Sequence, residues 1–176
     1  AHLDALLRLR PASIEALQPQ ANALAVNPAT QSHMVDALAG NPPWRGRFLH
    51  GLAKSDFRSD DIAPLFLQLS LKSGLDPNEF KPWLERLRTE KRYSQAYVTW
   101  ANLIPGSQRK HLGNVFDGGF ELPIEEHVGD FAWNSRDVNG AMVLWTGTRG
   151  TVGESSYSVQ FEGRRTPFAD MSQLLV

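Results

Sequence analysis

The sequence predicts an α+β fold, with a helical domain over residues 1–112 and an antiparallel β domain over residues 113–176. Up to Gly113, apolar residues recur at the spacing of amphipathic helices. Beyond it, short segments alternate between apolar and polar residues and are separated by glycine-rich turns. The charge also changes: the first part holds 14 Lys or Arg against 10 Asp or Glu, and the second holds 4 against 9. At 176 residues, the chain has room for two small domains.

The first helical segments are separated by prolines. Helical spacing predicts a helix over Leu3–Leu9, which Pro11 ends. A second helix is expected over Ser13–Val26, whose first residue is a suitable N-cap, with a kink at Pro19. A third is expected over Gln31–Ala39, because Gly and Pro follow it.

Four further helices are expected in this half, over Trp44–Ala53, Asp60–Ser73, Asp76–Glu90 and Ser94–Leu103. The third of them starts with Asp-Pro and has Glu79 three residues after its first residue, which is the pattern of a capping box. The large aromatic residues of this half are expected in the core: Trp44, Phe48, Phe66, Phe80, Trp83, Tyr93, Tyr97 and Trp100.

The last two of these helices carry a motif. It reads F-x2-W-L-x2-L from Phe80 and Y-x2-A-x3-W from Tyr93. This resembles the helix hairpin of the tetratricopeptide repeat (TPR), W-x2-L-G-x2-Y…A-x3-F…P, with Ala96 as the small residue between the helices. The chain departs from the pattern at Leu84, where a small residue is usual, and at Pro105, which comes early. No clear second copy follows at a 34-residue period, so a generic α-hairpin in an irregular bundle is the alternative.

The second half predicts short strands. Their spacing and the glycines between them indicate an antiparallel sandwich. In the segment from Ser156 to Phe161, apolar and polar side chains alternate strictly. The expected strands cover residues 114–116, 119–122, 131–135, 141–145, 156–161 and 172–176.

Two short motifs of the β half resemble a known family. The run D-G-G-F-E from Asp117 precedes Trp133, and S-V-Q-F-E-G from Ser158 precedes S-Q-L-L-V from Ser172. These motifs resemble the jelly-roll carbohydrate-binding modules of the xylan- and glucan-binding type. The resemblance implies a jelly-roll sandwich and a structural calcium ion, with Glu121 and Asp117 as ligands.

The β half is short for such a module. Only 64 residues follow Leu112, whereas a complete jelly roll needs about 100. Either the native chain continues beyond Val176 or a neighbouring chain completes the sandwich.

Sugar sites use exposed aromatic rings flanked by polar groups. Trp145 is the best candidate, with Arg149, Tyr157 and Trp133 as neighbours in the expected site. The alternative is that Trp133 and Trp145 lie between the sheets as core residues.

Catalytic chemistry has little support in the sequence. Cysteine is absent, and the five histidines have no metal-ligand spacing, so zinc is not expected. An acidic cluster could supply the two carboxylates of a glycoside hydrolase, although a solvated loop is the simpler interpretation. The cluster consists of Glu121, Glu125, Glu126 and Asp130.

These observations predict a non-enzymatic binding protein without a cofactor other than the calcium ion. Helices would dock a protein, and the sandwich would bind a saccharide, which would suit a bacterial cell-envelope or exported protein better than a cytoplasmic one. The alternative is a pure protein-interaction or assembly module with a structural β domain, and a glycoside hydrolase ranks third. The acidic β half disfavours nucleic acid as a partner, and no apolar run is long enough to span a membrane.

Overall fold

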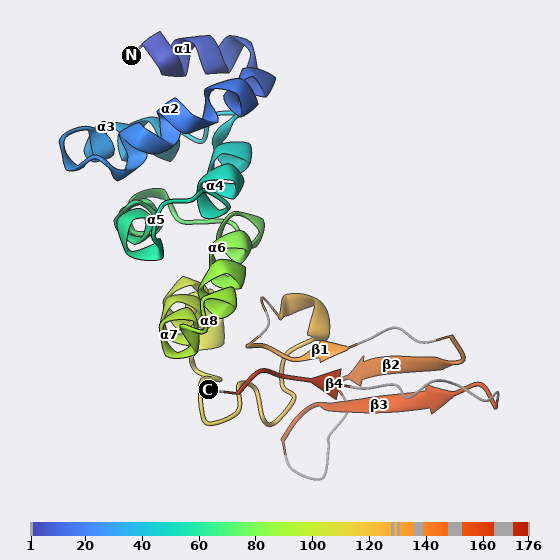
Figure 1. Ribbon diagram of the computed structural model, residues 1–176. Coiled ribbons are helices and arrows are strands. Elements are labelled where there is room, and N and C mark those ends of the chain that lie inside the picture. Colours follow the sequence, from blue (N-terminus) through green and yellow to red (C-terminus); the bar gives the residue numbers. More distant parts are fainter. Residues whose placement is uncertain are drawn as a thin grey trace. The chain divides into compact units, whose positions relative to one another are not determined.

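The computed structural model confirms the α+β order, with helices first and antiparallel strands last (Figure 1). It divides into two compact units, Ala1–Thr99 and Trp100–Val176, so the predicted change of composition at Gly113 lies inside the second unit. No described helix is both long and apolar enough to cross a bilayer. The structure describes residues 2–127, 129, 131–135, 139–147, 153–163 and 171–175.

The predicted helices are confirmed, with small shifts of their ends. Ser13 does not cap α2, because a 3₁₀ turn precedes it and the Ser13 side chain makes no capping hydrogen bond. Asn27 instead caps α3, accepting a 2.9 Å bond from the Ala29 amide, and Pro28 takes the first helical position. The helices are α1 (His2–Leu9), α2 (Ile14–Val26), α3 (Pro28–Ala39), α4 (Arg45–Ala53), α5 (Ser59–Ser73), α6 (Pro77–Thr89) and α7 (Tyr93–Leu103).

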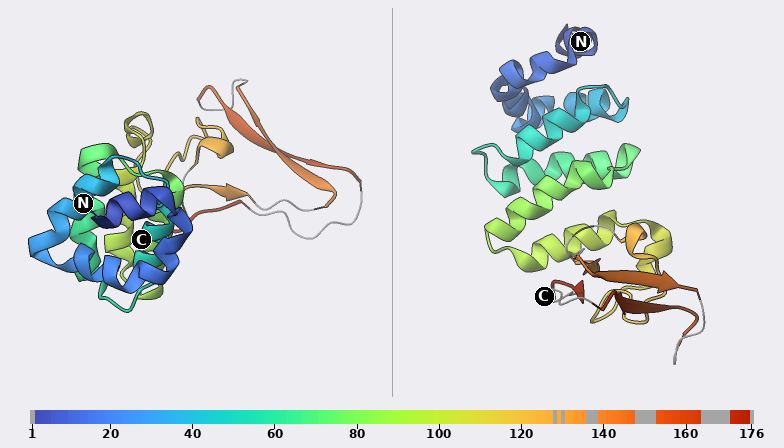
Figure 2. Two further views of the ribbon diagram at one scale, coloured as in Figure 1. Left: turned by 90° about the horizontal axis from the view of Figure 1, so that it is seen from above. Right: turned by 90° about the vertical axis from the view of Figure 1, so that its right-hand side faces the viewer.

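Within the first unit, the helices stack in two rows (Figures 1 and 2). Helix α2 packs on α4 and α4 packs on α6, while α3 packs on α5. The first residues of α2, α4 and α6 are 14, 45 and 77, so they lie 31 and 32 positions apart. Those of α3, α5 and α7 are 28, 59 and 93, so they lie 31 and 34 apart. The arrangement is therefore a repeated helix pair that the sequence pattern alone did not reveal.

Most buried residues of a stacked helix lie on one face. In α3 they follow the spacing i, i+3, i+4 and i+7, and α4 and α6 show the same spacing with one further buried residue each, Ala53 and Pro82. Phe66 stacks on Trp83 with ring centroids 4.7 Å apart. The predicted core aromatics are buried except Tyr97, which is half-buried, and Tyr93, which is exposed because it starts its helix.

One buried arginine joins four of these helices. The Arg45 guanidinium donates to the carbonyls of Leu38 (3.2 Å) and Gly74 (2.6 Å) and to the Ser73 hydroxyl (3.1 Å). It also forms an ion pair with Glu79 at 2.8 Å. The same Glu79 carboxylate closes the predicted capping box at the start of α6. The ends of α3, α5 and α6 are thus fixed to α4.

In the second unit, the strands β2 (Ala141–Thr146) and β3 (Ser156–Phe161) confirm the prediction. They pair antiparallel, with Trp145 opposite Tyr157. A second antiparallel pair joins β1 (Asn134–Ser135) to β4 (Met171–Ser172). The described strands therefore form two two-stranded sheets.

The strands predicted over residues 114–116 and 119–122 are wrong, because this segment is a series of turns. Asp117 and Phe120 have positive φ angles of 46° and 57°, which extended strands do not allow. The segment follows the short helix α8 (Gly106–Arg109) and precedes the 3₁₀ turn η2 (Ile124–Glu126).

Aromatic packing holds this turn segment inside the second unit. Trp100 is fully buried, and its ring lies 5.1 Å from that of Phe116 and 5.6 Å from that of Phe131. The two phenylalanines are themselves almost fully buried. A single aromatic cluster therefore anchors the segment that contains the D-G-G-F-E motif.

Candidate functional site

The D-G-G-F-E motif and Leu122 after it form the Asp117 loop (residues 117–122), which contacts the described residues of the predicted sites in the second unit. The Asp117 carboxylate is fully buried. Its oxygens accept hydrogen bonds from the amides of Glu121 (2.9 Å) and Leu122 (3.0 Å). These two bonds close the loop and hold its left-handed residues in place.

Two histidines complete the surroundings of Asp117. His127 Nε2 lies 3.2 Å from the carboxylate, and its Nδ1 lies 3.3 Å from the carbonyl oxygen of Trp133. His111 Nδ1 lies 3.3 Å from the other carboxylate oxygen. The Asp117 carboxylate is thus the centre of a buried polar network that connects the loop to both histidines.

The predicted sugar-binding aromatics bind the same loop through their polar atoms. The Trp133 indole donates to the Asp117 carbonyl (3.2 Å), and the Trp145 indole donates to that of Phe120 (3.1 Å). The Tyr157 hydroxyl donates to the Leu122 carbonyl at 2.8 Å. All three residues are half-buried.

Phe120 lies between two of these aromatics. Its ring is 5.1 Å from that of Trp133 and 5.4 Å from that of Tyr157, in tilted and edge-on arrangements. Burial, and then the negative charge of Asp117, raise the pKa of the Tyr157 phenol. The hydroxyl therefore stays protonated and remains a donor to the loop. Arg149, the fourth predicted sugar-site residue, lies outside the described residues.

Glu121 is also bound to the protein. Its carboxylate accepts a 3.2 Å hydrogen bond from the amide of Glu154. The backbone approaches closely here because Gly153, with φ of 95°, leaves room for the carboxylate: a Cβ atom at that position would collide with Glu121 Oε1. The Asp117 loop is thereby fixed to the turn that precedes β3.

The two calcium ligands that the family resemblance implies, Asp117 and Glu121, are already engaged in hydrogen bonds. The oxygens of Asp117 and Glu121 already accept bonds from backbone amides, which a cation would have to displace. Over the described ranges, no group of three or more His, Cys, Asp or Glu residues has the geometry to hold a metal ion. The calcium site remains a prediction that no contact of the described residues favours.

The acidic cluster considered for glycoside hydrolysis is not assembled by the described residues. Glu121 is directed to the backbone of Glu154. Asp130 lies outside the described residues, as does the side chain of Glu126. The Glu125 carboxylate is close enough to Tyr157 to raise the pKa of its phenol, after burial and Asp117. Among the residues that the structure describes, no contact brings two carboxylates of this cluster together.

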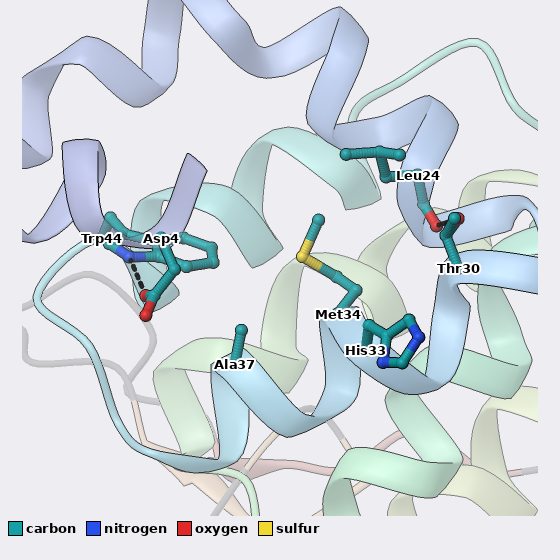
Figure 3. Close-up of a pocket in the computed structure, with 7 residues that line it drawn as sticks. All are labelled: Asp4, Leu24, Thr30, His33, Met34, Ala37 and Trp44. Carbon is teal, nitrogen blue, oxygen red and sulfur yellow. Dashed lines mark hydrogen bonds between the residues drawn. The ribbon is translucent and has the colours of Figure 1, made fainter. Parts of the chain in front are cut away.

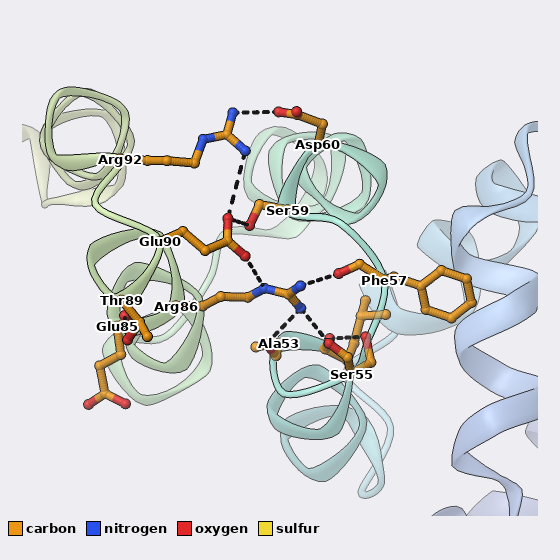
Figure 4. Close-up of polar contacts among 11 residues, drawn as sticks. Ala53, Ser55, Phe57, Ser59, Asp60, Glu85, Arg86, Thr89, Glu90 and Arg92 are labelled. Carbon is orange, nitrogen blue, oxygen red and sulfur yellow. Dashed lines mark hydrogen bonds and ion pairs between the residues drawn. The ribbon is translucent and has the colours of Figure 1, made fainter.

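In the helical unit, Arg86 of α6 fixes the loop between α4 and α5 (Figure 4). Its guanidinium donates to the carbonyls of Ala53 (3.1 Å), Ser55 (2.7 Å) and Phe57. It also forms an ion pair with Glu90 at 2.9 Å. Carbonyls at a helix C-terminus have no partner within the helix, and a cation is favoured there. Arg86 therefore holds the loop in one conformation.

Glu90 links this contact to the start of α5 (Figure 4). It accepts a hydrogen bond from the Ser59 hydroxyl and lies 3.9 Å from the Arg92 guanidinium. The Ser59 hydrogen bond, and then the Arg86 hydrogen bond, lower the pKa of Glu90. Arg92 in turn pairs with Asp60 at 2.5 Å, which lowers the pKa of that carboxyl.

A small hollow lies between α1, α2 and α3 (Figure 3). Its volume is about 160 Å³, below the range of roughly 300–1,000 Å³ typical of ligand pockets. At one end the indole of Trp44 donates a 3.3 Å hydrogen bond to Asp4. The hollow is therefore too small for most ligands, and its lining consists of Asp4, Leu24, Thr30, His33, Met34, Ala37 and Trp44.

Sequence reasoning named the aromatic residues but missed the groups that hold them. The sequence predicts Asp117 only as a calcium ligand and gives no role to His127 or Arg86. A buried acid in a glycine-rich turn is a usable signal, because Asp side chains often bond to amides a few residues ahead. The carbonyls that Arg86 binds come from the end of α4 and the loop after it, so no local pattern could have identified them.

The contact between Gly153 and Glu121 makes a specific prediction. Gly153→Ala should destabilise the second unit by about 1–3 kcal/mol, because its φ is unfavourable for alanine and its Cβ displaces Glu121. Urea unfolding followed by tryptophan fluorescence measures the change. Gly147→Ala is the matched control, because its Cβ would make only an ordinary 3.8 Å contact with Trp145. Equal stability of the two variants would contradict the proposed close approach.

Glu90 makes the stability of the helical unit depend on pH. Because folding lowers its pKa from the ordinary 4.5, the ionised form stabilises the folded state above that pH. The contribution is lost as the pH falls below 4.5 through the lowered value. Glu90→Gln should therefore flatten the acid limb of the stability curve, measured by helical circular dichroism during urea unfolding between pH 7 and 3. Glu85→Gln, on the exposed face of α6, should follow the wild type; an unchanged acid limb in Glu90→Gln would refute this assignment.

Neither unit has a recognisable relative among known proteins. No protein-family model matches this chain, and no curated protein or solved structure is significantly similar to it.

Proposed function

We propose that this chain is a non-enzymatic binding protein whose helical unit docks another protein. The observation that carries the proposal is the pair of helix rows, with helix starts 31 to 34 positions apart. This spacing is close to the 34 residues of a TPR. Stacked helix pairs of this kind offer extended surfaces that suit a polypeptide partner.

Most residues of the TPR-like motif in α6 and α7 pack in the core of the protein. Phe80 and Trp83 of α6 are almost fully buried, and Ala96 of α7 is fully buried. Leu84, where a TPR has a small residue, is 4% exposed and is accommodated in the core. The TPR-like interpretation is thus compatible with how these residues pack, and it favours a docking role for the helical unit.

The β unit offers a second candidate function, saccharide binding. What favours it is that Trp145 and Tyr157 face each other across β2 and β3 and are both half-buried. Their polar atoms already bond to the Asp117 loop, so only ring faces remain for stacking on a sugar. A jelly-roll fold and a place in the bacterial cell envelope belong to this second candidate, by resemblance only.

Peptide selection tests the docking role. A phage library of random 12-residue peptides is selected on the immobilised full chain, and the selected peptides are titrated by fluorescence polarisation. We expect saturable binding that protects amides of residues 4–99 from hydrogen exchange, because the partner surface is assigned to the helix rows. A failure to select any peptide, or protection confined to the second unit, would contradict the docking role.

Tryptophan fluorescence tests the saccharide role. Soluble xylan, β-glucan and other polysaccharides are titrated into the wild type and into Trp145→Ala. If Trp145 stacks on a sugar ring, the wild type gives a saturable change that the variant lacks. Leu9→Ala, a highly exposed residue of α1, is the control. A wild type that responds to none of the polysaccharides would leave the β unit with a structural role.

A further inference from the structure

A cavity between α2 and α4 shows how the helical unit could hold a polypeptide. Its volume is about 510 Å³, within the range of roughly 300–1,000 Å³ typical of ligand sites. It lies beside the loop that Arg86 fixes. The residues that matter for its chemistry are Gln18, Asn22, Gly51, Ser55, Asp56 and Phe57.

Gly51 permits the close approach at the base of this cavity. A Cβ atom on Gly51 would lie 2.5 Å from both Cδ and Oε1 of Gln18. Glycine inside a helix costs about 1 kcal/mol relative to alanine. The other glycine of α4, Gly46, would have nothing within 4 Å of a Cβ atom. The two glycines thus differ: only Gly51 leaves space for a side chain from the neighbouring helix.

A hydrogen bond from the Gln18 side-chain amide fixes the orientation of the Asn22 side-chain amide. Gln18 Nε2 donates to Asn22 Oδ1 (2.7 Å) and to the Phe48 carbonyl (3.2 Å), which uses both of its hydrogen atoms. Because the Asn22 amide is planar, its Nδ2 group is directed away from Gln18. Asn22 is only 5% exposed, and no described residue accepts a hydrogen bond from this nitrogen. A nearly buried amide therefore keeps two donors at a cavity wall.

The rim of the cavity adds an acid and an aromatic ring. Asp56 is the only ionisable side chain in the lining, so the cavity favours neutral or positively charged groups. Figure 4 shows the Phe57 ring directed away from the Arg86 contacts, and this side chain lines the cavity as well. Arg86 bonds to the carbonyls of Ser55 and Phe57, on both sides of Asp56. The rim is therefore held in place before any ligand arrives.

We propose that this cavity binds an extended segment of a partner protein, with a main-chain carbonyl on Asn22 Nδ2 and a Lys or Arg side chain near Asp56. A peptide suits these groups because each of its units offers both an acceptor and a donor, to match Asn22 Nδ2 and Gln18 Oε1, to which no described residue donates. This inference rests on the proposed docking role and names its site and ligand class.

The test uses the 12-residue peptides selected on the full chain. Their affinities are compared for the wild type, Asn22→Ala, Gly51→Ala, Asp56→Asn and the control Gly46→Ala, with thermal unfolding of each variant as a check of folding. We expect about tenfold weaker binding by Asn22→Ala and by Gly51→Ala, and wild-type affinity in Gly46→Ala. Asp56→Asn should weaken only those peptides that contain Lys or Arg.

The outcomes separate the two proposals. If peptides bind the wild type and bind Asn22→Ala and Asp56→Asn equally well, the cavity is not the site, although the docking role stands. If no peptide is selected, the docking role itself is contradicted. Because Asn22→Ala adds no atoms to the packed helices, it keeps the test valid even if Gly51→Ala fails to fold.

Discussion

The helical unit depends on the ion pair between Arg45 and Glu79, because it satisfies the ends of several helices with one side chain. The last carbonyls of a helix have no partner within it, and burying them unpaired is costly. Arg45 donates hydrogen bonds to carbonyls near the ends of α3 and α5. Glu79 accepts a hydrogen bond from the backbone amide of Asp76, the residue just before α6. A buried ion pair contributes little net stability, but it is strongly unfavourable to break. Its main effect is therefore to fix how the helix rows are joined.

In the second unit, a negatively charged side chain, Asp117, satisfies backbone groups as Arg45 does in the helical unit. The Asp117 carboxylate collects two backbone amides and His127 in a segment that has no regular secondary structure. Its loop then exposes carbonyls to which Trp133, Trp145 and Tyr157 donate. The aromatic residues thus have a structural task whatever else they do. A ligand that bound these three side chains would meet ring faces, because their polar atoms are already bonded to the loop.

Most helices and the main strands could be predicted from the sequence, and each wrong or missing prediction has a physical reason. Helical periodicity located α1 to α7 but not the short α8, and strict alternation located β3 at its observed ends, Ser156 and Phe161. The turns around Asp117 were mistaken for strands because Val115 and Phe116 are typical strand residues, whereas a single carboxylate determines the loop. The repeat went unnoticed because equivalent positions hold unlike residues. Where α2 has Ile14 at its first position, α4 has Arg45 and α6 has Pro77.

The same reasoning explains why the proposed peptide site lies where sequence patterns are least informative. Its features depend on pairs that are distant in sequence: Gly51 with Gln18, and Arg86 with the loop around Asp56. Each member is unremarkable alone, as an interior glycine, an exposed acid or a half-buried amide. Together they form a wall whose donors are oriented by Gln18 and a rim whose backbone is held by Arg86. Groups fixed in this way lose little conformational entropy on binding, which favours the proposed binding of a flexible chain in this shallow cavity.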